Sequence, residues 1–132
     1  MAEGYGRLND DTRLWRRVPG DRWSLPEEGA GEIVPEPQGN AFRAKGGDDG
    51  VSVGLAAVFE ARGEGPDDFV AEGQGDATWG VLEITVGQVR ELGFDVEQDE
   101  VDHALITPLP SGKKSRRMAK ELATWIKSPR WP

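Results

Sequence analysis

The chain of 132 residues contains no cysteine. It therefore has no disulfide framework, no thiol nucleophile and no thiolate ligand for a metal ion. A chain without cysteine also fits a reducing compartment. Only one histidine, His103, is present, so a metal site would have to depend on carboxylates. No acidic stretch has the ligand spacing of a calcium-binding EF-hand. We expect no metal site and no cofactor.

Long apolar runs are also missing. No run approaches the roughly 18 residues that a membrane span needs, and the N-terminal MAEGYGRLNDD has no apolar signal segment. We expect a soluble, cytoplasmic protein that binds no membrane. Apolar residues make up only 36% of the chain, whereas 18 glycines and 9 prolines are many for its length. This composition predicts a single domain over residues 1–132, with a modest core, long Gly/Pro-rich loops and a flexible tail over residues 1–11.

Charge is distributed unevenly. The net charge is −8, but the segment from Ser111 to Pro132 has seven Lys or Arg and one acidic residue, which is +6. The other residues include nine basic and 23 acidic side chains, which is −14. This asymmetry predicts either internal pairing or a basic surface for an acidic protein or a phosphate-bearing molecule. Nucleic acid is an unfavourable partner, because the acidic body would repel its phosphates.

The apolar pattern predicts strands joined by a few short helices. Residues 79–84 alternate as a strand, and the capping-box pair Thr85 and Gln88 then begins a short helix that Gly93 ends. Residues 51–61 fit a strand that turns into a short helix. The other expected extended segments are residues 12–18, 94–100 and 102–107. We predict an α+β fold with a small mixed or antiparallel sheet.

The last expected element is an amphipathic C-terminal helix over about residues 115–127. Its apolar side chains follow the spacing i, i+4, i+7 and i+8, which places them on one helical face. These residues are Met118, Leu122, Trp125 and Ile126. A fully enclosed Trp125 would make Trp125→Ala cost about 3–5 kcal/mol.

His103 precedes the apolar run ALIT. A histidine can act as a general acid or base, or can donate an orienting hydrogen bond. Asp102 adjoins it, but neighbours on a strand point to opposite faces, so we do not expect Asp102 to be its partner. The alternative is a structural role at a strand end. We expect His103 at the edge of a central strand, with its ring near the strand of residues 12–18.

Basic residues crowd the start of the expected last helix. They are Lys113, Lys114, Arg116 and Arg117. The helix dipole disfavours cations at this end, so an anion could supply the compensation, and the cluster would then bind phosphate or carboxylate. The alternative is compensation by acids of the same chain, such as residues 97–100. No phosphate-binding P-loop motif is present.

Three arginines flank Trp15 in the first expected strand: Arg13, Arg16 and Arg17. Because strand neighbours alternate between faces, at least one of these arginines should point inward or along a cleft, where it needs a partner. That partner is either a ligand or a carboxylate at the edge of the core, such as Glu83.

Several stretches together resemble a family of small, uncharacterised bacterial proteins. They are LWRRV near the start, NAFRAKGGDDGVSVGLA in the middle, and DHALITP followed by GKKSRRMAKELATWI. The resemblance covers most of the chain in order. The family's pattern has serines where this chain has Gly39 and Asn40. The resemblance implies no activity, because none is assigned to the family.

A more distant resemblance is to the ADP-ribosyltransferase-like toxin fold. That fold has an arginine on its first strand, a small hydroxyl residue on a middle strand and a glutamate later. Arg16 or Arg17, Ser52 and Glu83 come in that order, and His103 is a further catalytic candidate. The resemblance implies a small NAD-using transferase. This is the alternative to our first hypothesis, a non-enzymatic binding or accessory module that acts on an acidic or phosphate-bearing partner through its basic C-terminal helix and the LWRR strand.

Overall fold

The computed structural model describes residues 6–18, 23–24, 36–37, 42, 50–73, 80–107 and 112–127. In chain order the elements are β1 (Arg13–Val18), β2 (Trp23–Ser24), β3 (Glu36–Pro37), β4 (Val51–Leu55), α1 (Ala56–Ala61), α2 (Pro66–Gly73), β5 (Gly80–Thr85), α3 (Val86–Glu91), β6 (Asp95–Glu100), β7 (His103–Thr107), α4 (Gly112–Arg117), the π-helical turn η2 (Met118–Leu122) and β8 (Thr124–Lys127). Gly39, Asn40 and most of the loop predicted before them lie outside the described residues.

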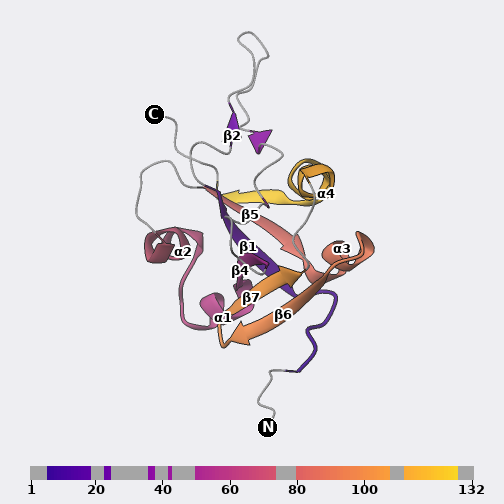
Figure 1. Cartoon of the computed structure of the whole chain (residues 1–132). Helices are drawn as coiled ribbons and strands as arrows, with labels where there is room; N and C mark the ends of the chain where they lie inside the picture. The colour runs from indigo at the N-terminus through magenta and orange to yellow at the C-terminus, as the bar shows by residue number, and fades with distance from the viewer. Residues whose placement is uncertain are drawn as a thin grey trace.

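Six strands form one sheet in the order β6-β7-β4-β1-β5-β8 (Figure 1). Every neighbouring pair in this sheet is antiparallel. β2 and β3 form a separate antiparallel pair. With its short helices, the fold is α+β, which confirms the predicted class.

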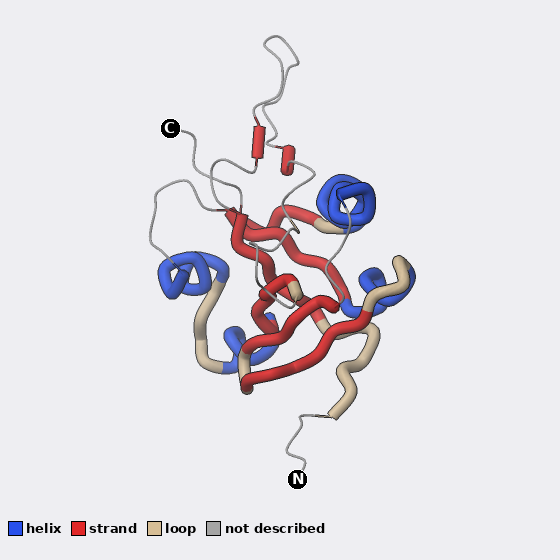
Figure 2. Tube along the Cα trace, viewed as in Figure 1, coloured by secondary structure: helices blue, strands red, loops and turns tan. Residues whose placement is uncertain are grey.

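Helices lie on both sides of the sheet (Figure 2). On β1, Leu14 and Val18 belong to one buried apolar cluster, and Trp15 belongs to the other. The first cluster includes residues of α3 and η2, so we call its side of the sheet the α3–η2 face. The second includes residues of α1 and α2, and its side is the α1–α2 face. Because side chains alternate along each strand, the sheet has a core on both faces, and the core on the α3–η2 face is the larger one.

The α1–α2 face is built around an aromatic cluster. The ring of Trp15 lies 5.9 Å from that of Phe59 and 5.7 Å from that of Phe69, measured between centroids. Gly54 lies opposite Trp15 on β4, and a Cβ at this position would collide with the rings of Phe59 and Phe69. The absence of a side chain at Gly54 is therefore what lets the two helices approach the sheet.

The turn from β5 into α3 follows the predicted capping box. The Thr85 hydroxyl accepts a hydrogen bond from the Gln88 N–H at 3.2 Å, and the Gln88 side chain accepts one from the Thr85 N–H at 2.9 Å. Gly93 follows the helix with φ of 91°, a conformation that glycine adopts at little cost. Asp10, in the predicted tail, accepts a hydrogen bond from the Gly87 N–H at 2.7 Å through its backbone carbonyl, which anchors that segment to α3.

The predicted C-terminal helix is wrong beyond Leu122. Ala123 is extended, with φ of −82° and ψ of 153°, and β8 then pairs with β5. Trp125 consequently packs against the cluster on the α3–η2 face, whereas Ile126 packs against the cluster on the other face. Adjacent apolar residues suit a strand that contacts a core on each side, and aromatic and β-branched residues favour strands.

Candidate functional site

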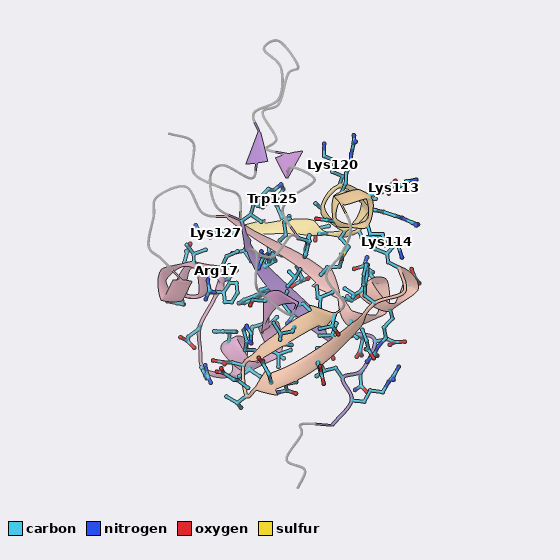
Figure 3. The ribbon with its side chains drawn as sticks, in the orientation of Figure 1. Arg17, Lys113, Lys114, Lys120, Trp125 and Lys127 are labelled. Atoms are coloured by element: carbon cyan, nitrogen blue, oxygen red, sulfur yellow. The ribbon has the colours of Figure 1, made fainter. Side chains whose placement is uncertain are left out.

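The helical segment formed by α4 and η2 has two different sides. The side that faces the protein carries the buried residues Ser115, Met118 and Ala119. The outer side carries four exposed cations, which we call the basic stripe: Lys113, Arg116, Arg117 and Lys120. Their spacing of i, i+3, i+4 and i+7 is that of one helical face. Figure 3 shows Lys113 and Lys120 extending away from the sheet.

A π turn and a residue of α3 hold the end of this segment. The Ala123 N–H donates to the Met118 carbonyl at 2.8 Å, which is an i to i+5 bond. Gln88 Nε2 donates to the Leu122 carbonyl at 3.2 Å, so this residue of the capping box also satisfies a carbonyl at the helix end. π turns of this length occur frequently at functional sites.

Few carboxylates compensate the basic stripe. Arg117 pairs with Glu121 at 3.5 Å, and both side chains are more than half exposed, so this pair contributes little stability. In the part of the chain that the structure describes, Lys113, Arg116 and Lys120 form no ion pair. Three cations of the stripe are therefore exposed and have no carboxylate partner among the described residues.

Lys114, one of the four predicted cations, behaves differently from the stripe. Its Nζ donates to the Leu92 carbonyl at 3.0 Å and lies 5.0 Å from the centroid of the Phe94 ring. It therefore ties α4 to the loop after α3. Lys120 is the cation that the sequence analysis missed. The spacing from Lys113 and Arg116 is the signal that could have identified it.

The acids suggested as internal compensation lie elsewhere. Residues 97–100 belong to β6, at the edge of the sheet opposite β8. Among them, Asp99 contacts His103, and Glu97 and Glu100 pair with no cation among the described residues. The described acids of β6 therefore do not neutralise the basic stripe.

Arg13 is held by two carboxylates on the α1–α2 face. It bonds to Glu60 and, at 3.2 Å, to Glu83. The hydrogen bond from Arg13 to Glu60 is the main cause that raises the pKa of this arginine. Glu83 also accepts a hydrogen bond from Trp15 Nε1 at 3.0 Å. The expected arginine partner at the core edge is thus present for Arg13.

Two further arginines are paired in the same way. Arg62 contacts Asp102 at 2.9 Å. Arg90 contacts Asp10 at 2.5 Å and Asp95 at 2.9 Å. The bond to Asp10, followed by that to Asp95, raises the pKa of Arg90. Arg13, Arg62 and Arg90 are therefore bound to carboxylates, in contrast to Lys113, Arg116 and Lys120 among the described residues.

His103 forms a dyad with an acid of the neighbouring strand. Its Nδ1 lies 2.6 Å from Asp99 Oδ1, and both side chains are partly exposed. Asp102 bonds Arg62 instead, so it is not the partner of His103, as strand alternation predicts. A carboxylate at Nδ1 fixes the ring and leaves Nε2 for chemistry. No described residue hydrogen-bonds to Nε2, so the dyad has no nucleophile beside it among these residues.

The expected position of His103 is partly wrong. β7 is second from the edge of the sheet, and β4 lies between it and β1. His103 is opposite Gly54 on β4, so β4 separates its backbone from β1. The sequence indicated the strand but not the strand order, which depends on long-range pairing.

The residues proposed for a transferase are not assembled around an open carboxylate. Arg16 is two residues after Leu14 on β1 and so shares the α3–η2 face with it. Its side chain donates to the Ser52 carbonyl at 2.9 Å. Arg17 lies on the other face, donates to the Phe69 carbonyl at 2.6 Å and stacks 3.9 Å over that ring. The Ser52 side chain is exposed. Glu83 is occupied by the donors Arg13 and Trp15.

Comparisons with protein-family models, curated proteins and solved structures give no match. Among the described residues, no group of three or more His, Cys, Asp or Glu could hold a metal ion. No helix in the described ranges is both long and apolar enough to cross a membrane. Function is therefore inferred from the arrangement of side chains alone.

Proposed function

We propose that this protein is a small binding or accessory module that holds an anionic partner on its basic stripe. The partner is an acidic protein or a phosphate-bearing molecule, since carboxylate and phosphate groups are the anions that Lys and Arg bind. One contrast carries the proposal. Lys113, Arg116 and Lys120 have no ion pair in the described structure, whereas Arg13 and Arg90 each contact two carboxylates.

The character of the surface indicates how such a partner would bind. The only exposed large apolar side chain among the described residues is Val101, in the turn between β6 and β7. The stripe therefore has no described aromatic or aliphatic anchor of the kind that dominates tight protein interfaces. Binding would be mainly electrostatic, fast and sensitive to salt.

The test compares two single charge reversals. Arg116→Glu alters the stripe, whereas Arg7→Glu makes the same change in charge at an exposed residue of the N-terminal segment. The probes are a fluorescent poly-glutamate peptide and inorganic triphosphate, measured by anisotropy and by thermal shift. We expect at least one probe to bind the wild type. Arg116→Glu should weaken this binding roughly tenfold or more, and Arg7→Glu should weaken it much less.

Measuring the stability of Arg116→Glu tests the alternative that acids of the same chain neutralise the stripe. Because the stripe is exposed, Arg116→Glu should change the free energy of unfolding by less than about 0.5 kcal/mol. A strongly destabilised Arg116→Glu protein that binds neither probe would contradict the proposal and would assign the cations to internal structure. Equal weakening by Arg116→Glu and Arg7→Glu would also contradict it, because binding would then follow net charge alone.

The NAD-using transferase remains the alternative from the sequence, but no contact among the described residues favours it. Such an enzyme needs a carboxylate that is free to polarise its acceptor. Glu83 instead bonds Arg13 and Trp15 and is only 21% exposed. A binding module is therefore the function that these side chains support best.

A further inference from the structure

We propose that the anionic partner of the basic stripe is the acidic edge strand β6 of a second copy of this chain. This inference rests on the function proposed above and specifies its partner. The contact would run head to tail, with the stripe of one copy on β6 of the next. Both surfaces are present on every molecule, so no other protein is needed to supply the complementary charge.

Within one molecule, no cation of the stripe pairs with an acid of β6 among the described residues. β6 and β8 are the opposite edges of the sheet, with four strands between them. The stripe lies on the segment that leads directly into β8. Lys114, beside the stripe, donates to the Leu92 carbonyl at 3.0 Å and lies 5.0 Å from the centroid of the Phe94 ring, so the first turn of α4 lies near the start of β6. In the described structure, the charges of the stripe are therefore left available to pair with the β6 acids of another molecule.

The acidic side chains of β6 match the stripe in sign and length. Four acidic residues of this strand are exposed: Asp95, Glu97, Asp99 and Glu100. Asp95 contacts Arg90 and Asp99 contacts His103, whereas Glu97 and Glu100 contact no cation among the described residues. Alternate residues of a strand are about 6.8 Å apart, so the first three extend over roughly 13 Å. From Lys113 to Lys120 a helix rises about 10 Å. A helix lying along β6 could therefore place several of its cations near carboxylates.

The form of the edge favours a helix over an added strand. In the described structure β6 pairs with β7 alone, so its other side is open. Charged side chains on an edge strand oppose the addition of a further strand, and the register shift between Gln98 and Glu100 interrupts the ladder. Side-chain contacts from a basic helix avoid both obstacles.

The symmetry of the contact has a consequence for assembly. Each copy contributes a different surface, so the contact is heterologous and leaves a free stripe at one end and a free β6 at the other. Assembly would continue beyond a dimer or close into a ring. Each copy has a net charge of −8, and this overall repulsion is limited at physiological ionic strength, where the Debye length is about 8 Å.

The experiment is a charge exchange followed by sedimentation velocity over a wide range of protein concentrations. Arg116→Glu/Lys120→Glu makes the stripe acidic, and Glu97→Lys/Glu100→Lys makes β6 basic. We expect the wild type to associate with rising concentration and to dissociate in high salt. Each variant alone should remain monomeric. An equimolar mixture should associate, because each variant then meets a surface of opposite charge on the other.

A matched control changes two exposed acids outside β6, Asp11 and Glu91, to lysine, and it should associate like the wild type. Glu97→Gln is the milder variant if the double lysine protein does not fold, and it should weaken association. A wild type that stays monomeric at every concentration, or a mixture that does not associate, overturns this inference. If Arg116 still governs poly-glutamate binding in that case, the proposed function stands. If neither probe nor second copy binds, both proposals fall.

Discussion

The cations of this protein occupy two different settings. On the body, Arg13 and Arg90 each contact two carboxylates, and Arg90 is only 14% exposed. On the last helical segment, Lys113, Arg116 and Lys120 are exposed and contact no carboxylate among the described residues. A paired, partly buried cation contributes to the fold, and its removal leaves its acids unsatisfied. Removal of an exposed, unpaired cation should leave the stability of the fold nearly unchanged, and such a cation is available to bind a partner.

The largest expected difference in stability is between a tryptophan at the centre of the sheet and one on β8, the strand that follows the last helical segment. Trp15 is 1% exposed and packs against Phe59 and Phe69, so Trp15→Ala should cost about 3–5 kcal/mol of stability. Trp125 is only partly buried, on the edge strand β8, so Trp125→Ala should cost about half as much or less. Urea unfolding followed by circular dichroism measures both values. Equal costs would show that the edge of the sheet is as tightly packed as its centre.

A smaller effect should separate two glutamates that each contact an arginine. Glu83 is 21% exposed and accepts bonds from Arg13 and Trp15, so Glu83→Ala should cost about 1–3 kcal/mol because both donors lose a partner. Glu121 is 66% exposed and contacts Arg117, so Glu121→Ala should stay within about 0.5 kcal/mol. Glu83→Gln keeps an acceptor and should fall between these values. If Glu83→Ala does not change the free energy of unfolding, the proposed distinction between the two regions is contradicted.

Much of the local structure could be predicted from the sequence. The capping box of Thr85 and Gln88 is confirmed, because it needs only residues three apart. The strand that becomes a helix over residues 51–61 is also confirmed. Such features depend on local propensity and spacing, which sequence reasoning reads directly.

The features that were missed depend on contacts between distant residues. Trp125 and Ile126 fit the helical spacing, but β5 offers an open edge, and pairing with it makes them a strand. Two neighbouring apolar residues that are both buried fit the periodicity of a helix and also that of a strand with a core on each face. The Asp99 partner of His103 likewise depends on the register between β6 and β7. The helical spacing of the basic stripe could be predicted from the sequence. Whether acids elsewhere in the chain neutralise these cations could not, because that depends on the tertiary structure.

The smallest expected effect is on the pH dependence of stability, and it comes from protonation of Asp95, which contacts Arg90. The Val96 N–H, at 2.8 Å, and then Arg90 lower the pKa of Asp95 in the folded protein. The unfolded value is about 3.9. A lowered folded pKa stabilises the protein above the unfolded pKa, and this contribution is lost as the pH falls through the folded pKa.

Asp95→Asn should therefore reduce stability at pH 7 and flatten its decline below about pH 4. Asp95 is more than half exposed, so solvent screening should keep the difference below about 1 kcal/mol. Arg90→Gln should reproduce only part of the flattening, because the bond from Val96 remains. Urea midpoints between pH 2 and pH 7 test this. If wild type and Asp95→Asn decline in parallel below pH 4, Asp95 does not couple folding to protonation, and Arg90 is less dependent on its carboxylates than its contacts indicate.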